Sequence, residues 1–276
     1  MPLLFFLLML PNPDEVNGCE RCRAIIHAGT NSPDGMGSPA DSRLEKLDSL
    51  FAAVSGRGGF HGALGVVYKG GVFYQHCSGL ANMETGRAFT PRTSMEIASL
   101  SKQFTAAAIL LLEQDGVLSS EDYAASYLPE GFPYKDVKII HLVTHTAGLP
   151  DYTPWFIENW KHDRFVTNAD IMAYLIEHRP DAVFAPGERY AYSNTGYVVL
   201  AEVVHQASGM PLDVFLQDRL FDRFPFENSG FYNRSLIYEM ENYAPSWHWS
   251  VEEGRYVRPE SIPGREYLAF LSGRLG

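Results

Sequence analysis

The feature that most constrains the fold is an apolar helix expected from about residue 99 to residue 115. One stripe of this helix consists of five apolar residues: Leu100, Phe104, Ala107, Ala108 and Leu111. Most of its remaining positions are also apolar, and a helix that is apolar nearly all round is buried inside a domain. Gly116 follows as a suitable C-terminal stop. We therefore expect the rest of the domain to pack around this helix.

The start of this helix carries a serine and a lysine three residues apart. At that spacing Ser99 and Lys102 share one helix face. A serine hydroxyl is a weak nucleophile until a neighbouring base activates it, and an unprotonated lysine can be that base. A lysine beside a buried helix is partly removed from water, which favours the neutral amine. The Ser-x-x-Lys pattern occurs once in the chain. A helix start with a surface lysine is the simplest alternative.

A second polar pattern, Tyr192-Ser193-Asn194, lies in a loop marked by Pro186 and Gly187. An apolar helix is expected to follow at residues 198–207. A tyrosine can act as general base and then as general acid, and an asparagine amide can hold a substrate carbonyl. In isolation, the same tripeptide is most often a turn with a solvated amide.

The other expected elements follow from hydrophobic periodicity and from turn residues. Helices are predicted at 42–55, 137–144, 168–178 and 211–221, and strands at 60–69 and 72–78 around a Gly70-Gly71 turn. A hairpin-like turn is expected at 252–254. No strand-like alternation occurs between residues 119 and 189, so this segment is predicted to be helical.

Composition narrows the classes of partner and location. The 276 residues are 46% hydrophobic and 20% charged, and the net charge of -11 argues against nucleic acid or an anionic membrane as partner. Cys19, Cys22 and Cys77 lack the second pair that a zinc site needs. The apolar run at residues 3–10 is too short to span a bilayer and has no basic flank. Export and a cytoplasmic location both stay open, and no integral membrane span is expected.

Four motifs in order give the chain a resemblance to a known superfamily. They are Ser99-Leu100-Ser101-Lys102, Leu112-Glu113-Gln114-Asp115-Gly116, His141 to Pro150, and Pro186-Gly187 through Tyr192-Ser193-Asn194-Thr195-Gly196-Tyr197. From about residue 44 to about residue 256 the chain resembles the serine β-lactamase and penicillin-binding-protein superfamily. Within it, the similarity is to class C β-lactamases, D,D-peptidases and β-lactamase-like esterases.

The resemblance implies an α/β (α+β) fold, in which an antiparallel sheet is flanked by helices and carries an inserted all-helical subdomain. The expected division is a leader or linker at 1–41, an α/β part at 42–118 and 210–276, and an all-helical part at 119–209 that holds the Tyr-x-Asn loop. The sheet is expected to be incomplete.

The resemblance also implies the roles of the site residues. Ser99 is the expected acyl-forming nucleophile, Lys102 its proton partner, Tyr192 the general base and acid, and Asn194 a substrate-binding residue. His145 belongs to a loop that is structural in the family. No metal or organic cofactor is implied. The expected partner is a small-molecule or peptide-like substrate with an ester, amide or β-lactam bond.

One departure from the family concerns its third motif, Lys/His-x-Gly, which lies on a strand beside the serine. No such tripeptide follows Asn194, since His248-Trp249-Ser250 lacks the glycine. His27-Ala28-Gly29 precedes Ser99 in the expected linker. The sequence resembles the front portion of a family member, so impaired activity is expected.

Two alternatives to a serine hydrolase of this type stay open. The first is a non-catalytic member or fragment that binds a peptide-like ligand without turnover. The second is a GDSL- or α/β-hydrolase-type esterase, against which the absence of a Gly-x-Ser-x-Gly motif counts.

Overall fold

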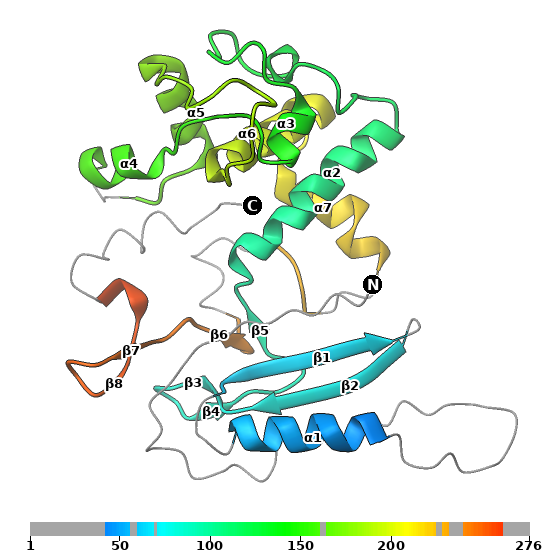
Figure 1. The fold of residues 1–276 in the computed structure, drawn as a ribbon, viewed down its shortest axis with the longest axis vertical. Helices are drawn as coiled ribbons and strands as arrows, with labels where there is room; N and C mark the ends of the chain where they lie inside the picture. Colours follow the sequence, from blue (N-terminus) through cyan, green and yellow to red (C-terminus); the bar gives the residue numbers. More distant parts are fainter. Residues whose placement is uncertain are drawn as a thin grey trace, which may run out of the picture. The chain divides into compact units, whose positions relative to one another are not determined.

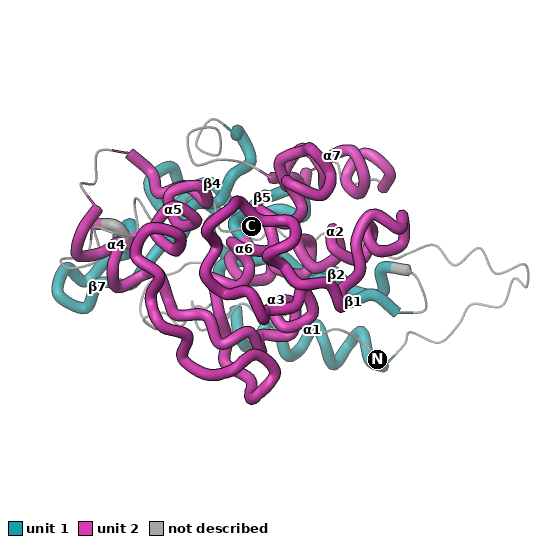
Figure 2. Tube along the Cα trace, turned by 90° about the horizontal axis from the view of Figure 1, so that it is seen from above, with its two compact units in different colours: residues 1–96, 240–258 teal, residues 97–239, 259–276 magenta. Residues whose placement is uncertain are grey.

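The structure is a computed structural model that describes residues 42–55, 60–68, 71–160, 164–224, 228–231 and 240–261. The expected leader with Cys19, Cys22 and His27, and the turn at Gly70, lie outside these residues. The chain forms two compact units, one of residues 1–96 with 240–258 and one of residues 97–239 with 259–276 (Figure 2). The division into α/β and all-helical parts that the sequence suggests stays a prediction.

The first unit contains all of the strands in the described residues. Helix α1 (Ser42–Ser55) lies beside a hairpin of β1 (Gly62–Tyr68) and β2 (Gly71–Ser78), whose antiparallel register runs from Gly62↔Ser78 to Tyr68↔Gly71 (Figure 1). The other pairs are β3 (Leu80–Asn82) with β4 (Arg87–Ala88), β5 (Ser94–Met95) with β6 (Tyr243–Ala244), and β7 (His248–Ser250) with β8 (Arg255–Val257). Each of these sheets has two strands, and only β5 with β6 is parallel.

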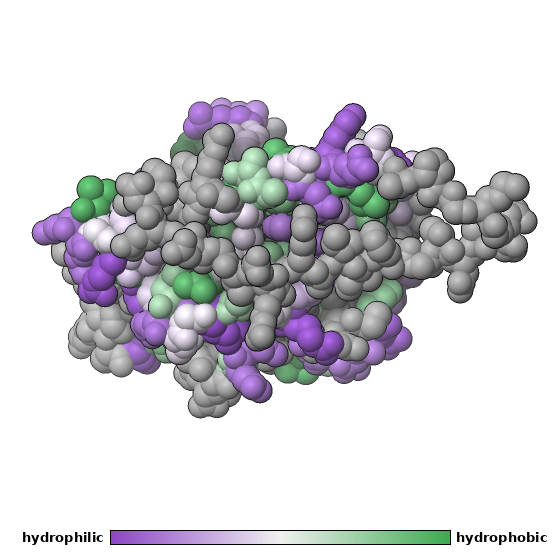
Figure 3. Space-filling model, turned by 90° about the horizontal axis from the view of Figure 1, so that it is seen from below, coloured by the Kyte–Doolittle hydropathy of each residue, from purple (hydrophilic) through white to green (hydrophobic). Residues whose placement is uncertain are grey.

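Small apolar clusters hold this unit together. Phe51 of α1 packs with Leu64 and Tyr74 of the hairpin, because alternate strand residues face the helix. The outward side of the hairpin is less well covered, and Val67, with 62% of its surface exposed, is the clearest case. Apolar residues are interspersed with hydrophilic ones on the face shown in Figure 3. The expectation of an antiparallel but incomplete sheet flanked by helices is confirmed.

The second unit is helical in the described residues. Its elements are η2 (Ala98–Ser101), α2 (Lys102–Gln114), η3 (Ala124–Ser126), α3 (Ile139–Val143), α4 (Thr153–Asn159), α5 (Asn168–His178), α6 (Asn194–Ser208), α7 (Leu212–Arg219), η4 (Phe221–Arg223) and η5 (Pro259–Ser261). Helix α6 contacts α2, α3, α5 and α7. Nine of its residues are buried, which makes it the centre of the unit's core.

The expectation that the helix after Ser99 is buried nearly all round was wrong. Helix α2 buries Ala108, Ile109 and Leu112, but its Leu110 is 60% exposed, and Leu100 in the preceding turn η2 is 38% exposed. Helix α2 packs through one face onto α6 and α7, and its other face is open in this unit. Helix α2 therefore has more apolar residues than its packing buries, and α6 is the central helix of this unit instead.

The loop after α3 fixes the segment that leads to the Tyr-x-Asn motif. Gly148 has a φ of +70°, and a Cβ atom there would lie 2.1 Å from the carbonyl oxygen of Phe184. Only glycine allows the two backbones to approach so closely. Val183 N–H donates to the Gly148 carbonyl at 2.8 Å, and Gly187 N–H donates to the Thr146 carbonyl at 2.8 Å. Backbone hydrogen bonds therefore hold the loop at 146–148 against the segment at 183–187.

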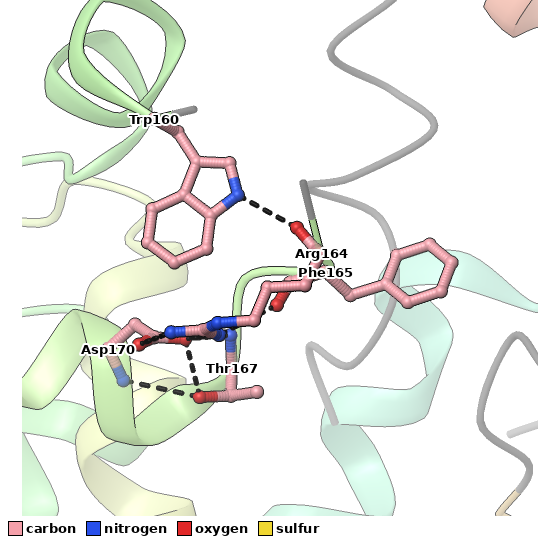
Figure 4. A network of polar contacts seen from close by, with 5 residues as sticks. All are labelled: Trp160, Arg164, Phe165, Thr167 and Asp170. Atoms are coloured by element: carbon pink, nitrogen blue, oxygen red, sulfur yellow. Dashed lines mark hydrogen bonds and ion pairs between the residues drawn. The ribbon is translucent and has the colours of Figure 1, made fainter. Parts of the chain in front are cut away.

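A polar network fixes the start of α5 (Figure 4). Arg164 donates two hydrogen bonds of 2.7 Å to the Asp170 carboxylate. The same carboxylate accepts from the backbone N–H of Thr167 at 2.8 Å and from its hydroxyl at 2.7 Å. Thr167 Oγ1 in turn accepts from Asp170 N–H at 3.3 Å, which completes a capping box. Trp160 Nε1–H donates to the Arg164 carbonyl at 2.8 Å, so Trp160 is also tied to this network.

We expect Asp170→Asn to lower the free energy of unfolding by about 1 kcal/mol at pH 7, because the amide replaces a carboxylate that accepts charge-assisted hydrogen bonds. The hydrogen bonds from Arg164, followed by those from Thr167, lower the pKa of Asp170 to about 2 against the opposing effect of burial. A lowered pKa means that this stability is present above the unfolded-state pKa of about 4 and is lost as the pH falls toward 2. Urea unfolding of wild type and variant should therefore differ at pH 7 and converge near pH 2. Asp213→Asn, at an aspartate in the first turn of α7, is the control; an equal loss in both variants would contradict the assignment.

Candidate active site

Ser99 lies in the 3-10 turn η2, directly before α2, and not in the first turn of the α-helix where the sequence had placed it. Its side chain is exposed. The preceding residue, Ala98, has a φ of +46°, which is an unfavourable left-handed conformation for a residue with a Cβ atom. Strain of this kind persists where the surrounding structure enforces it, often at functional sites. Here it occurs immediately before the candidate nucleophile.

Lys102 is the first residue of α2, and only 7% of its surface is exposed. Its Nζ donates a hydrogen bond of 3.2 Å to Ser99 Oγ. The same nitrogen lies 5.2 Å from the centroid of the Tyr192 ring and 5.5 Å from that of the Tyr197 ring, within the range of cation–π interactions. The amine is therefore held against the serine hydroxyl and largely shielded from water.

Tyr192 reaches the same oxygen from a position 93 residues further along the chain. Its hydroxyl donates a hydrogen bond of 2.6 Å to Ser99 Oγ. The Tyr192 side chain is half exposed, with 50% of the residue surface accessible. The packing of α2 against α6 brings the two motifs together, so a lysine amine and a tyrosine hydroxyl both bond to one serine oxygen.

Asn194 is the first residue of α6, so it lies at a helix start and not within the preceding loop. Ser193 caps this helix by accepting a hydrogen bond of 3.0 Å from Gly196 N–H. Of the four predicted site residues, Ser99, Lys102 and Tyr192 are joined by direct contacts. Asn194 adjoins them through the chain and is partly exposed.

Two residues of this site were not given an active role from the sequence. Tyr197 presents its ring to Lys102 and donates from its hydroxyl to the Val143 carbonyl at 3.0 Å. Burial raises the pKa of Tyr197, which keeps its hydroxyl protonated. His145 lies next to Tyr192, with ring centroids 4.6 Å apart. The three-residue step from Asn194 to Tyr197 on one helix face was the available signal for Tyr197.

The described residues contain no group of His, Cys, Asp or Glu side chains that could hold a metal ion. None of the helices in the described ranges has the length and hydropathy needed to cross a membrane.

The structure thus brings a lysine amine and a tyrosine hydroxyl within hydrogen-bond distance of one serine oxygen. The Beta-lactamase family model matches residues 47–266, and the chain belongs to this family of serine hydrolases. The resemblance inferred from the four motifs is thereby confirmed.

Three proteins illustrate the similarity. Penicillin-binding protein 4* of Bacillus subtilis (strain 168) is 37% identical over 236 residues, which are 85% of this chain and 52% of that protein. A D-aminopeptidase of Brucella anthropi is 33% identical over 163 residues, which are 58% of this chain and 30% of that protein. The crystal structure of a penicillin-binding protein from Bacillus halodurans matches with a TM-score of 0.58 at 29% identity, covering 67% of this chain and 55% of that one. The chain thus spans about half the length, or less, of the proteins that it matches.

Proposed function

We propose that the chain carries the acylation machinery of a serine hydrolase that acts on an ester, amide or β-lactam. The single observation that supports this most is the pair of hydrogen bonds to Ser99 Oγ, from Lys102 at 3.2 Å and from Tyr192 at 2.6 Å. For attack on a carbonyl carbon, one of these contacts must reverse so that the serine hydroxyl donates its proton. A neutral Lys102 amine or an ionised Tyr192 can receive it.

The proposed reaction has two halves. In the first, Ser99 Oγ bonds to the carbonyl carbon, the bond to the leaving group breaks, and the proton from Ser99 passes through Lys102 and Tyr192 to that group. In the second, water gives its proton to the same pair and attacks the acyl carbon, and Ser99 recovers its proton as it leaves. We assign to the Asn194 amide, beside Tyr192 at the start of α6, the binding of a substrate carbonyl.

The substrate class follows from the relatives only as a proposal. One is named a penicillin-binding protein and another a D-aminopeptidase. These names favour a peptide-like acyl donor with an amide bond, for which a β-lactam is a reactive probe.

The second candidate function is binding of a peptide-like ligand without turnover. The observation that favours it is the absence of a Lys/His-x-Gly tripeptide after Asn194 within the 276 residues. In the family, that motif lies on a strand beside the serine.

Covalent labelling separates the two functions. The chain should be incubated with a fluorescent penicillin and, separately, with a fluorophosphonate, and the adduct located by peptide mass spectrometry. An adduct on Ser99 supports the hydrolase. Saturable binding of the penicillin without an adduct from either probe supports the binding protein.

We expect acylation by the isolated 276-residue chain to be slow, about 10²–10³-fold below that of the Bacillus subtilis relative measured alongside it. The reason is that the strand with the Lys/His-x-Gly motif also supplies, in the family, a backbone N–H to the oxyanion hole, and the expected loss is that of one such donor. We also expect a low unfolding temperature, because a two-stranded hairpin is marginal in water, and β1–β2 exposes Val67 and Val72 at 62% and 46%. Stopped-flow labelling and a thermal melt followed by circular dichroism would check both. Rapid stoichiometric labelling with a sharp, high-temperature transition would contradict this prediction.

A further inference from the structure

His145 holds the backbone on both sides of Tyr192. Its carbonyl oxygen accepts a hydrogen bond of 2.9 Å from Ala191 N–H, and its Nδ1 accepts one of 3.1 Å from Ser193 N–H. The backbone of His145 has a φ of +59°, a left-handed conformation that is uncommon for residues other than glycine. This conformation lets one residue offer its carbonyl and its ring nitrogen to the same segment. The segment that carries Tyr192 is therefore fixed at two points, one residue before it and one after it.

The imidazole ring also contacts the Tyr192 side chain itself. The two ring centroids are 4.6 Å apart with planes tilted by 33°. On α6, the Tyr197 ring lies 5.0 Å from the same imidazole at 35°, and Tyr190 meets it edge-on at 5.8 Å. Tyr197 is itself anchored through its hydroxyl to the Val143 carbonyl. The Tyr192 phenol, which points onto Ser99 Oγ, is thus packed against the His145 ring.

The hydrogen bond from Ser193 fixes the chemical form of the imidazole. Because a backbone N–H is the donor, Nδ1 must be unprotonated, and the neutral ring then carries its proton on Nε2. Protonation would place a second N–H against Ser193 N–H and break the contact. Burial, followed by the positive charge of Lys102, lowers the pKa of His145 and favours the neutral form. The titratable groups that face the ring are Lys102, Tyr190, Tyr192 and Tyr197.

We propose that His145, as a neutral imidazole that accepts at Nδ1, is the positioning residue that aims the Tyr192 hydroxyl at Ser99. This goes beyond the structural loop role implied by the resemblance, and it rests on the proposed acylation chemistry. His145 does not touch Ser99 in the structure; it acts through Tyr192. A displacement of about 1 Å in a reacting group can cost about 10²-fold in rate. The contacts of His145 with the Tyr192 segment therefore affect the reaction rate through Tyr192.

Three variants separate positioning from general support of the fold. His145→Asn keeps a side-chain acceptor near the place of Nδ1, and asparagine tolerates the left-handed backbone. His145→Phe keeps an aromatic ring beside Tyr192 and removes the acceptor. His141→Asn is the matched control, because His141 Nδ1 likewise accepts a backbone N–H, from Lys138 at 3.2 Å, at the start of α3. Active-site titration with a fluorophosphonate corrects each rate for the folded fraction.

The limiting acylation rate and the Kd for a fluorescent penicillin should be measured separately. We expect His145→Phe to lower the limiting rate by about 10²-fold with little change in Kd, His145→Asn to restore most of the rate, and His141→Asn to match wild type. A wild-type rate in His145→Phe, or equal losses in all three variants, would overturn the proposal.

A measurement on the wild-type chain, independent of activity, keeps the test decisive if His145→Phe does not fold. In ¹⁵N nuclear magnetic resonance, we expect the His145 signals of a neutral imidazole that is protonated on Nε2 at pH 7. Protonation on Nδ1 at pH 7 would overturn the proposal. If no probe acylates the wild-type chain, the proposed function fails. The geometric part then still stands or falls on hydrogen exchange at Ser193 N–H, the donor to His145 Nδ1, which should be slow in wild type and in His145→Asn and faster in His145→Phe.

Discussion

Ser99→Ala is expected to abolish covalent labelling and to reduce turnover of a chromogenic short-chain ester by at least about 10⁴-fold, the scale seen when a nucleophile is removed from a catalytic unit. The reason is that Ser99 Oγ is the one atom that both Lys102 and Tyr192 contact. Alanine removes that atom and leaves the turn and the two partners in place. Initial rates and mass-spectrometric detection of the adduct check the result.

The control for this change is Ser101→Ala, at the serine two residues further along in the same 3-10 turn. It should label at close to the wild-type rate. If Ser99→Ala kept its turnover, or if the adduct mapped to another residue, the chemistry would have to be assigned elsewhere in the chain.

Lys102→Ala and Tyr192→Phe should each reduce acylation by several orders of magnitude, whereas the double variant should be little worse than either one. Members of one catalytic unit are strongly non-additive, because the loss of one disables the other. Tyr192→Phe is the sharper probe, since it removes only the hydroxyl that donates to Ser99 and keeps the ring beside His145. A double-mutant cycle on the limiting acylation rate measures the coupling.

Lys138→Ala serves as the lysine control for this cycle, because Lys138 is paired with Glu121 at the surface. It should acylate like wild type. Fully multiplicative losses in the Lys102→Ala, Tyr192→Phe double variant would show that the two residues act independently, and the idea of one proton-handling unit would then be wrong.

Local sequence signals predicted several elements closely. The helices expected at 42–55 and 168–178 occur as α1 (Ser42–Ser55) and α5 (Asn168–His178). Both have a clear apolar stripe, and Thr167 caps α5 through the capping box with Asp170. The hairpin near residue 253 occurs as β7 with β8. In each case the hydrogen bonds that define the element close within a few residues, so the sequence nearby carries the information.

Elements whose partners lie far along the chain were missed. The parallel pair β5 with β6 joins Ser94 to Tyr243, and no local sequence pattern predicts such a pairing. Helix α4 (Thr153–Asn159) is a single short helix whose apolar residues pack into an aromatic cluster around Phe156. Its stability comes from those tertiary contacts, because a helix of this length is marginal by itself.

By itself, the sequence determined the family and indicated the residues of the candidate site, because Ser-x-x-Lys and Tyr-x-Asn are patterns of neighbouring residues. Only the tertiary structure decided that α6 and not α2 is the central helix, and that His145 adopts a left-handed conformation against the Tyr192 loop. It also placed the Tyr192 hydroxyl 2.6 Å from Ser99 Oγ, although the two residues are 93 positions apart in the sequence. The physical reason is that burial and hydrogen bonding between distant segments depend on the packing of all helices at once. A local pattern states which groups are present and leaves open which of them meet.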